Sequence, residues 1–254
     1  MSQDTQNNSN KKNNISLKSL FNAHVTTAIA TSVVLSLALL FTPLGKLAMK
    51  RYLVNNGEDI VTSIRSLEER EVKRAQEEAE GNVDKVTEML MNNPRNIVLG
   101  NKEAKNMIIE FFDYSCGYCK KQAAELQKII TEKGSDVKLL LVDLPMLSEN
   151  SVFASRASGL VKAKKPESFA SFYFALMGSP DAETSTVVAV AAKLGLSKQE
   201  VETAMKSQDA DAELFRDNQQ AFMMLAGKGA PLVIVNGKIF NGFVSAEQIM
   251  EAMQ

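Results

Sequence analysis

The stretch Ile108–Lys121, "IIEFFDYSCGYCKK", decides the predicted fold, because it joins a short apolar run to the only two cysteines of the chain. Cys116 and Cys119 lie so close together that a disulfide between them closes only a tiny loop, of little entropic value. No second pair of cysteines exists to crosslink the fold. The pair therefore serves thiol exchange or metal ligation, or it is a chance occurrence.

The segments around the cysteines predict an α/β fold. The runs 107–112, "MIIEFF", and 137–144, "VKLLLVDL", are short and apolar, as buried strands are. Between them, "CKKQAAELQKIITEKG" has a helical period and ends at Gly134. Strand, helix and strand in this order predict a βαβ unit with parallel strands.

The rest of the carboxyl-terminal half predicts a helical insert and a return to the sheet. Four segments with a helical period follow one another over about 148–216, and the aromatic residues there, Tyr173 among them, are predicted to pack this insert. The run 230–242, "APLVIVNGKIFNG", predicts a hairpin turning at Asn236–Gly237. The last ten residues, "SAEQIMEAMQ", predict a capped helix.

Composition and charge describe a normal globular chain with an unusual beginning. Of 254 residues, 45% are hydrophobic and 23% charged, with 29 Lys and Arg against 30 Asp and Glu and no long basic block. This balance argues against a nucleic-acid partner. The first residues are rich in Asn, Ser and Gln, so we predict a disordered tail over 1–24.

Residues 25–45 predict a membrane segment. They contain no charged side chain, and a helix of that length crosses a hydrocarbon core of ~30 Å. A cleaved signal segment is the alternative, but the exit "TPLGKLAMKRY" lacks a good small-residue cleavage site, which favours an uncleaved anchor. Lysines precede and follow the segment, so charge predicts no orientation.

An amphipathic helix is predicted over 58–91, with a break at Gly81–Asn82. Its apolar positions recur mostly at three- and four-residue steps: Ile60, Ile64, Leu67, Ala75, Ala79, Val83, Val86 and Leu90. Two interpretations remain open. The helix lies on its own domain, or residues 46–92 form a stalk through which copies of the chain associate.

The spacing of the cysteines suits thiol chemistry. With Cys116 in the loop after a strand and Cys119 in the first turn of a helix, the helix dipole and free N–H groups pull the pKa of Cys116 below its usual ~8.5. A thiolate at Cys116 attacks a disulfide, and Cys119 then resolves the mixed disulfide. A zinc site needs about four ligands, which the single histidine, His24, cannot complete.

Two further residues fit such a site. Pro231 stands at the start of an apolar strand run, and a cis Ala230–Pro231 bond there would expose backbone groups for pairing with an extended substrate. Glu110 lies within an apolar run beside the dithiol. It is either an edge-strand carboxylate or a buried acid of raised pKa that exchanges a proton with the resolving thiol.

Together these residues resemble a known family. "EFFDYSCGYCK", the helical insert, "GAPLVIVNG" and "FNGFVSAEQI" resemble the DsbA-like thiol-disulfide oxidoreductases over residues 93–254. The resemblance implies an α/β thioredoxin fold with an inserted helical domain, here preceded by the stalk and the transmembrane helix. "RYLVNNGEDIVTSIRSLEEREVKR" further resembles the amino-terminal helices of ScsC-type members, which self-associate and work as disulfide isomerases.

The resemblance also assigns roles to individual residues. It implies Cys116 as nucleophile, Cys119 as resolving thiol, Glu110 as buried acid, Pro231 as the cis-proline facing the dithiol, and Gly117 and Tyr118 as the redox-tuning dipeptide. Gly-Tyr departs from the Pro-His of strongly oxidising members and matches bacterial disulfide isomerases. Ala230, another redox-tuning position, departs from the Thr or Val of many relatives.

The expected protein is a disulfide isomerase or oxidoreductase without cofactor or metal, on the periplasmic side of the bacterial cell envelope, because disulfide exchange on folding proteins needs an oxidising compartment. It would be anchored in the inner membrane, form homo-oligomers, depend on a membrane redox partner and act on reduced or misbridged polypeptides. One alternative is a DsbA-like dithiol oxidase. Another is a non-catalytic surface-exposed binding protein or chaperone with a static disulfide.

Overall fold

The computed structural model describes residues 25–34, 38, 42–94, 96–207 and 211–254, and the chain divides into two compact units, Met1–Arg70 and Glu71–Gln254. In the first unit, residues 25–34 are helical, α2 spans Pro43–Asn55, and α3 (Gly57–Asn92) begins. Among the described residues, no helix is both long and apolar enough to cross a membrane. Residues 35–37 and 39–41 of the predicted membrane segment, and the predicted tail, lie outside the described part of the chain.

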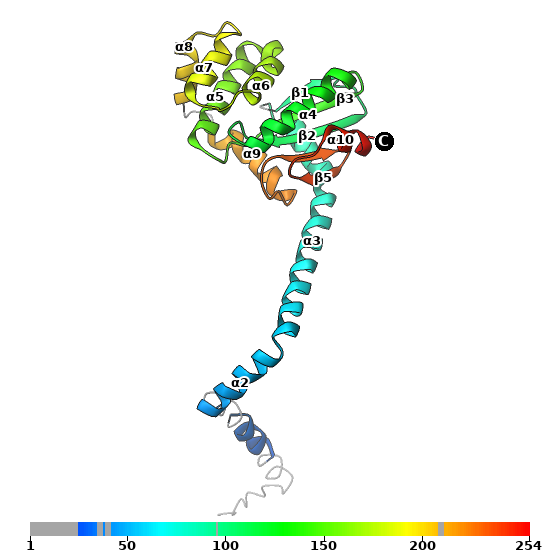
Figure 1. Cartoon of the computed structure of the whole chain (residues 1–254), viewed down its shortest axis with the longest axis vertical. Helices are drawn as coiled ribbons and strands as arrows, with labels where there is room; N and C mark the ends of the chain where they lie inside the picture. The colour runs from blue at the N-terminus through cyan, green and yellow to red at the C-terminus, as the bar shows by residue number, and fades with distance from the viewer. Residues whose placement is uncertain (1–24, 35–37, 39–41, 95, 208–210) are drawn as a thin grey trace, which may run out of the picture. The chain divides into compact units, whose positions relative to one another are not determined.

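The second unit is built on a five-stranded sheet with the order β1-β3-β2-β4-β5 (Figure 1). Strand β2 pairs parallel with β3, and the other neighbours are antiparallel. The elements are β1 (Ile97–Gly100), β2 (Asn106–Phe112), α4 (Gly117–Lys133), β3 (Val137–Asp143), α5 (Glu149–Lys164), the 3-10 turn η1 (Pro166–Ser168), α6 (Phe169–Met177), α7 (Thr184–Ala192), α8 (Lys198–Lys206), α9 (Asp211–Met224), β4 (Leu232–Val235), β5 (Lys238–Asn241) and α10 (Ala246–Ala252). The predicted βαβ unit is therefore confirmed as β2-α4-β3.

Local sequence signals place several of these boundaries. Cys116 is the N-cap of α4, and the helix ends at Gly134 as predicted. The β4–β5 hairpin turns at Asn236 and Gly237, whose φ angles of 47° and 91° are those that an Asn-Gly turn supplies with little strain. Ser245 caps α10 in a capping box with Gln248. These signals act within a few residues, so the sequence alone reveals them.

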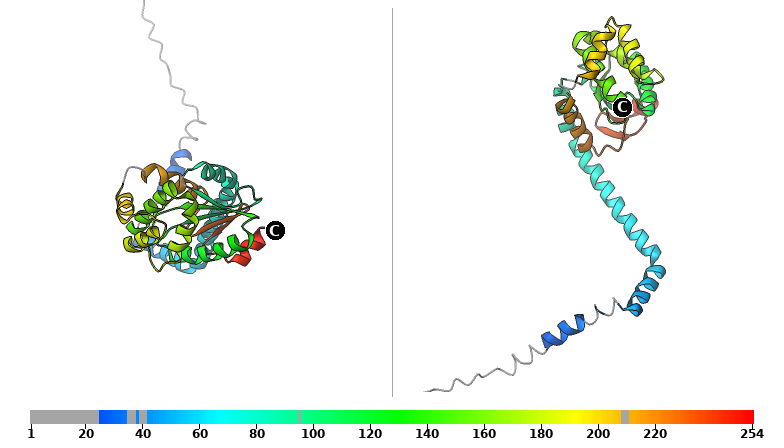
Figure 2. Two further views of the ribbon diagram at one scale, coloured as in Figure 1. Left: turned by 90° about the horizontal axis from the view of Figure 1, so that it is seen from above. Right: turned by 90° about the vertical axis from the view of Figure 1, so that its left-hand side faces the viewer.

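Alternation along β2 divides the core between the two faces of the sheet. Ile108 and Phe112 pack in a cluster with α4 and the helical insert. Ile109 and Phe111 pack in a second cluster with residues of α3 and α9. The sheet is thus covered by helices on both sides, as Figure 2 shows. Residue 110 shares the α4 face with its even-numbered neighbours, because side chains alternate along a strand.

The predicted break in the long amphipathic helix is wrong. Helix α3 continues through Gly81 and Asn82, and the chain turns instead at Asn56, between α2 and α3. Inside the second unit, Val83 and Val86 are buried, and Asn82 Nδ2 donates to the carbonyl of Met224 at 3.2 Å. A glycine costs a helix about 1 kcal/mol, which this packing outweighs.

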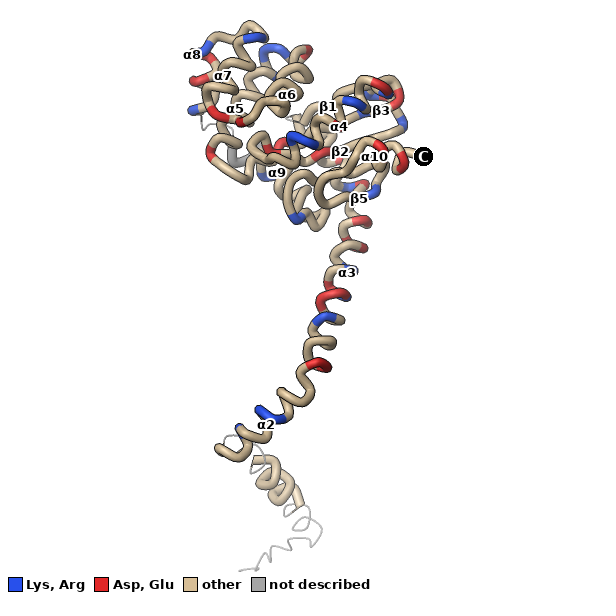
Figure 3. Tube along the Cα trace, in the orientation of Figure 1, with Lys and Arg blue, Asp and Glu red and all other residues tan. Residues whose placement is uncertain are grey.

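The apolar stripe of α3 divides into two parts. Ala79 and Leu90 are buried in the second unit, whereas Ile64 and Leu67, in the first unit, are 51% and 56% exposed. Charged residues of both signs occur along the same helix (Figure 3). The carboxyl-terminal part of α3 therefore lies on its own domain, and the exposed apolar positions belong to the amino-terminal part.

The helical insert consists of α5 to α8, with η1 leading into α6, and these helices gather together in Figure 1. The predicted insert boundary at 216 falls inside α9, a helix that the sequence analysis did not distinguish. In the segment 221–227, "AFMMLAG", the side chains of Ala221, Phe222 and Leu225 are buried on the sheet. Met223 is instead 65% exposed.

Candidate active site

Cys116 lies where the loop after β2 becomes helix α4. Its backbone is extended, with φ −79° and ψ 116°, as an N-cap requires. The N–H group of Cys119 donates to Cys116 Sγ at 3.3 Å, so the sulfur fills the place that a capping oxygen usually takes. The sulfur is therefore positioned at the positive end of the helix dipole.

This position acts on the pKa of Cys116, which is lowered to about 6. The main cause is the hydrogen bond from the Cys119 thiol, followed by the backbone N–H groups of Cys119 and Tyr118. Burial and the charge of Asp113 act in the opposite direction and are outweighed. At neutral pH, Cys116 is thus mostly a thiolate, the reactive form of cysteine.

Cys119 has the opposite character. Its side chain is fully buried, and burial is the largest cause that raises its pKa, followed by the hydrogen bond to Cys116 and the charge of Glu110. Both cysteines are free thiols in the structure. Cys116 retains 6% of its surface exposed, whereas Cys119 has none, and stepwise disulfide exchange requires such a difference between the attacking and the resolving thiol.

Glu110 is buried on the α4 face of the sheet, completely out of solvent. Tyr173 of α6 donates a short hydrogen bond to Glu110 Oε2, while Oε1 has no hydrogen-bond partner. Burial raises the pKa of Glu110 to about 8, the bond from Tyr173 opposes this rise, and the charge of Cys116 adds to it. The structure therefore agrees with the buried acid of raised pKa and not with an edge-strand carboxylate, because β2 is the central strand.

The loop before β4 completes the arrangement. The Ala230–Pro231 peptide bond is cis. In its protonated form, the Cys116 thiol donates to the carbonyl of Ala230 across 3.3 Å, and the carbonyl of Pro231 accepts from the N–H of Gly242 at 2.9 Å. Segments that are far apart in the sequence thus meet at one sulfur atom.

A scan of protein families finds a match over residues 92–254 to the model described as Thioredoxin. The chain belongs to the thioredoxin family. Within that family it is a DsbA-like thiol-disulfide oxidoreductase.

Three relatives illustrate the likeness. Disulfide bond formation protein D of Bacillus subtilis (strain 168) is 28% identical over 167 residues, which cover 62% of this chain and 75% of that protein. A thioredoxin-like oxidoreductase from Silicibacter pomeroyi DSS-3 is 31% identical, with a TM-score of 0.57, and covers 65% of this chain and 93% of its own. Proteus mirabilis ScsC in a transitional conformation has a TM-score of 0.59 at 22% identity, and the match covers 88% of this chain and 96% of the ScsC chain. This last likeness supports the fold alone.

The two residues between the cysteines of this thioredoxin-family site are little constrained. A Cβ atom added at Gly117 would meet no atom within 4 Å, so the space around it does not demand glycine. Tyr118 is 63% exposed, and the ammonium of Lys121 lies 5.1 Å from its ring centroid. The dipeptide is therefore free to contact a substrate. In the described part of the chain, no group of three or more His, Cys, Asp or Glu side chains could hold a metal ion.

Asp113 is a buried residue of the site that the sequence analysis missed. Its carboxylate accepts four hydrogen bonds, from Ser115 N at 2.7 Å, Ser151 Oγ at 2.7 Å, Met146 N at 2.8 Å and Leu147 N at 3.0 Å. It thereby ties the start of the thioredoxin active-site helix to the loop between β3 and α5. An acidic residue directly after a strand, in "FFDYSC", is the sequence signal that would have indicated it.

Lys120 and Tyr173 are the other missed members. Lys120 Nζ donates to three carbonyls at the end of α6 and beyond, those of Leu176, Ser179 and Asp181, at 3.3, 2.9 and 3.4 Å. Burial lowers the pKa of Lys120. Tyr173 was predicted only to pack the insert; it does so and also binds Glu110. Nothing in the sequence around Lys120 signals its contacts.

Proposed function

We propose that this protein catalyses disulfide isomerisation on polypeptides of the bacterial cell envelope through Cys116 and Cys119. The observation that carries the proposal is the contrast between the two thiols. The pKa of Cys116 is lowered to about 6, whereas the pKa of Cys119, fully buried one helical turn later, is raised. Such a pair supports attack by the first sulfur and delayed resolution by the second.

In the proposed reaction, the Cys116 thiolate attacks one sulfur of a substrate disulfide. A bond forms between that sulfur and Cys116, and the other substrate sulfur leaves as a thiolate. For isomerisation, a different thiolate of the substrate attacks the mixed disulfide and releases Cys116 unchanged. If no such thiolate reaches it, Cys119 attacks Cys116 instead, which oxidises the protein's dithiol and leaves the substrate reduced.

In this second route, Glu110 would accept the proton that Cys119 loses. Cys119 must lose its proton before it attacks, and Glu110 interacts electrostatically with it. Because the pKa of Glu110 is raised to about 8, it gives up and takes back a proton near neutral pH. In the reverse direction, protonated Glu110 supplies the proton that the departing Cys119 thiolate needs.

The substrate surface would be the exposed apolar residues near these sulfurs. Tyr118 is 63% exposed, Met146 45%, Leu147 57% and Phe243 43%. The backbone of Met146 and Leu147 is held by Asp113, and Phe243 follows the glycine that binds Pro231. Unfolded or misbridged polypeptides expose apolar segments of the kind that such a surface accepts.

A dithiol oxidase is the second candidate function, and the pKa of Cys116 bears on the choice. A strongly oxidising protein stabilises its thiolate further, with a pKa near ~3.5 in the best-known case, whereas reducing thioredoxin has about 7. The value of about 6 here supports a moderately oxidising dithiol. That favours isomerisation, because a less extreme potential lets the dithiol remain partly reduced.

The proposal extends to the placement of the protein. The uncharged run 25–45 would serve as an inner-membrane anchor, or as a signal segment that is removed. The exposed apolar side chains of α2 and the first unit's part of α3, including Leu47, Tyr52, Ile64 and Leu67, would pack against other copies. Membrane fractionation of the native host tests the anchor, and light scattering of the full chain with and without residues 1–70, the first unit, tests self-association. A truncated protein that keeps the same number of subunits as the full chain would remove the stalk from the proposal.

The first experiment is the equilibrium reduction potential of the full chain against glutathione, with refolding of scrambled ribonuclease as the activity. A potential near roughly −180 mV with isomerase activity is expected. A potential near about −120 mV, with fast oxidation of reduced ribonuclease and no reshuffling, would make the protein an oxidase.

The Cys116→Ser variant separates both enzymes from a binding module. It should lose all reshuffling and reduction of disulfides while binding unfolded ribonuclease as the wild type does. Cys119→Ser is the matched variant, which keeps the nucleophile and should accumulate mixed disulfides. If the wild type itself reshuffles no disulfides and both variants bind as it does, the binding-module alternative replaces the enzyme.

A further inference from the structure

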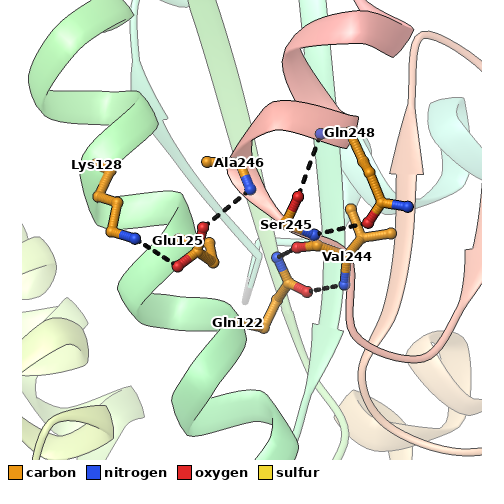
Figure 4. A network of polar contacts seen from close by, with 7 residues as sticks. All are labelled: Gln122, Glu125, Lys128, Val244, Ser245, Ala246 and Gln248. Atoms are coloured by element: carbon orange, nitrogen blue, oxygen red, sulfur yellow. Dashed lines mark hydrogen bonds and ion pairs between the residues drawn. The ribbon is translucent and has the colours of Figure 1, made fainter.

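Gln122 is a buried amide on α4, one turn after Cys119, and it has no place in the exchange chemistry described above. Its Nε2 donates to the carbonyl of Val244 at 3.0 Å, and its Oε1 accepts from the N–H of Val244 at 2.8 Å. Figure 4 shows this pair of bonds between the helix and the chain that leads into α10. The side chain thus pairs with one residue's backbone as a neighbouring strand would.

The backbone at Val244, which Gln122 binds, is continuous with the residues that bind Pro231 beside the dithiol. Two residues before Val244, Gly242 donates its N–H to the carbonyl of Pro231 at 2.9 Å, which continues the β4–β5 ladder beyond the Leu232 and Asn241 pair. The φ of Gly242 is 112°, a value open to glycine and not to other residues. The adjoining Ala230 carbonyl accepts from Cys116 Sγ.

These contacts form one continuous connection around the sulfur. Helix α4 carries Cys116 at its beginning and Gln122 further along, and Gln122 binds the segment Gly242–Val244. That segment binds Pro231, whose neighbour Ala230 contacts Cys116. Apart from the reactive sulfur, the connection consists of backbone groups and the side chain of Gln122. A substitution at Gln122 therefore interrupts it without changing the reactive sulfur.

We propose that Gln122 is a positioning residue for polypeptide substrates: its amide holds the segment Gly242–Val244 against α4 and so keeps the Ala230–Pro231 backbone and Phe243 in place beside Cys116. This inference rests on the proposed action on polypeptides. It concerns only substrates long enough to contact that backbone. A small disulfide, which meets the Cys116 sulfur alone, does not need Gln122.

The first test is Gln122→Met, which keeps the length of the side chain and removes both hydrogen bonds. In single-turnover oxidation of the reduced full chain, the half-saturating concentration of a disulfide-bonded peptide should rise roughly tenfold to a hundredfold. The limiting rate, the reduction potential and the rate with bis(2-hydroxyethyl) disulfide should stay as in the wild type. Hydrogen exchange of the Val244 amide should accelerate.

Glu125→Met is the matched control. Glu125 also joins α4 to the carboxyl-terminal segment, since its Oε2 accepts from the N–H of Ala246 at 2.9 Å and its Oε1 binds Lys128 (Figure 4). Its hydrogen bonds go to Ala246 and Lys128 and not to the segment Gly242–Val244. Its loss should destabilise the docking of α10 and leave peptide binding unchanged, which separates positioning at the site from general support of α10.

Gln122→Glu supplies a rescue that a merely structural effect would not show. A protonated carboxyl group accepts through one oxygen and donates through the other, as the amide does, whereas a carboxylate only accepts and faces the Val244 carbonyl. The ratio of variant to wild-type half-saturation should therefore fall toward one as the pH is lowered from 9 to 5. The charged groups along this part of α4 and α10, Glu125, Lys128 and Glu247, are the same in both proteins.

The outcomes separate this inference from the proposed function. Equal losses with the peptide and the small disulfide, or equal effects of Gln122→Met and Glu125→Met, would overturn the role of Gln122. A Gln122→Glu ratio that does not change with pH would do the same. A wild type that reacts with the small disulfide but shows no saturation with the peptide would instead overturn the action on polypeptides.

Discussion

Two buried polar sites in the thioredoxin domain contrast with each other. Around Glu110, one carboxyl oxygen is bound by Tyr173 and the other has no hydrogen-bond partner. Where α3 ends against α9, Asn93, Asn96 and Asn218 bind one another, and Asn218 also donates to the carbonyl of Asp143 at 2.9 Å. The first site holds an ionisable group with a displaced pKa, and the second joins side-chain amides to one another.

The difference shows how burial is used for two purposes. Amides that satisfy one another lose little by leaving water and fix which surfaces meet. A carboxyl group that is only half satisfied is costly to ionise, so its pKa rises to where proton exchange with a thiol becomes useful. At Glu110, the half-satisfied carboxyl group thus lies beside the two thiols, whereas the amides of the second site hold α3 and α9 together.

The largest effect is expected for the pH dependence of stability that Glu110 creates. Its folded pKa of about 8 exceeds its unfolded value of about 4.5, so the folded state binds the proton more tightly between these values. The free energy of unfolding should be highest, for this group, below pH 4.5 and should fall as the pH rises through 8. The full contribution is on the order of 5 kcal/mol.

Glu110→Gln removes this titration, and urea unfolding under reducing conditions at pH 5, 7 and 9 measures it. The stability of the variant relative to the wild type should improve steadily toward high pH. Cys116 contributes the opposite slope between its folded pKa of about 6 and its unfolded value in both proteins, so the comparison cancels it. Parallel pH profiles for the two proteins would contradict a raised pKa at Glu110.

Asn218→Leu should have the next largest effect, and on stability alone. It removes the hydrogen bonds that Asn218 makes with Asn93, Asn96 and the carbonyl of Asp143, at a cost of about 3 kcal/mol in the free energy of unfolding. The pKa of Cys116, followed by thiolate absorbance at 240 nm, should not move. Gln219→Ala, at an exposed neighbouring position on α9, should change neither. A shift in the Cys116 titration would show that the two polar sites are coupled.

Tyr173→Phe is expected to have the smallest effect and the most specific one. The hydroxyl of Tyr173 lowers the pKa of Glu110, so its removal should raise that pKa further and displace the pH-dependent loss of stability to higher pH. The stability itself should change by about 1 kcal/mol. Tyr114→Phe, which removes the bond to Ser158 Oγ at 3.0 Å, serves as the control. An unchanged pH profile in Tyr173→Phe would mean that burial alone sets the pKa of Glu110.

The sequence by itself predicted the elements of the site whose causes are local. The thiolate position of Cys116 follows from a helix that begins at that residue, and the hairpin follows from Asn236–Gly237. Both depend on neighbours in the chain, which the sequence displays directly. Glu110 was recognisable because a carboxylate inside an apolar run has no local way to remain in water.

Only the tertiary structure decided the contacts between distant segments. Tyr173 reaches Glu110 from another helix, Gln122 binds Val244 across 122 positions, and Asp113 gathers the N–H groups of a later loop. The same holds for Gly81, where packing on the sheet carries α3 through a residue that favours a break. A local sequence pattern favours one conformation by about 1 kcal/mol. Burial of side chains and pairing of buried polar groups contribute several kcal/mol, and both depend on the whole fold.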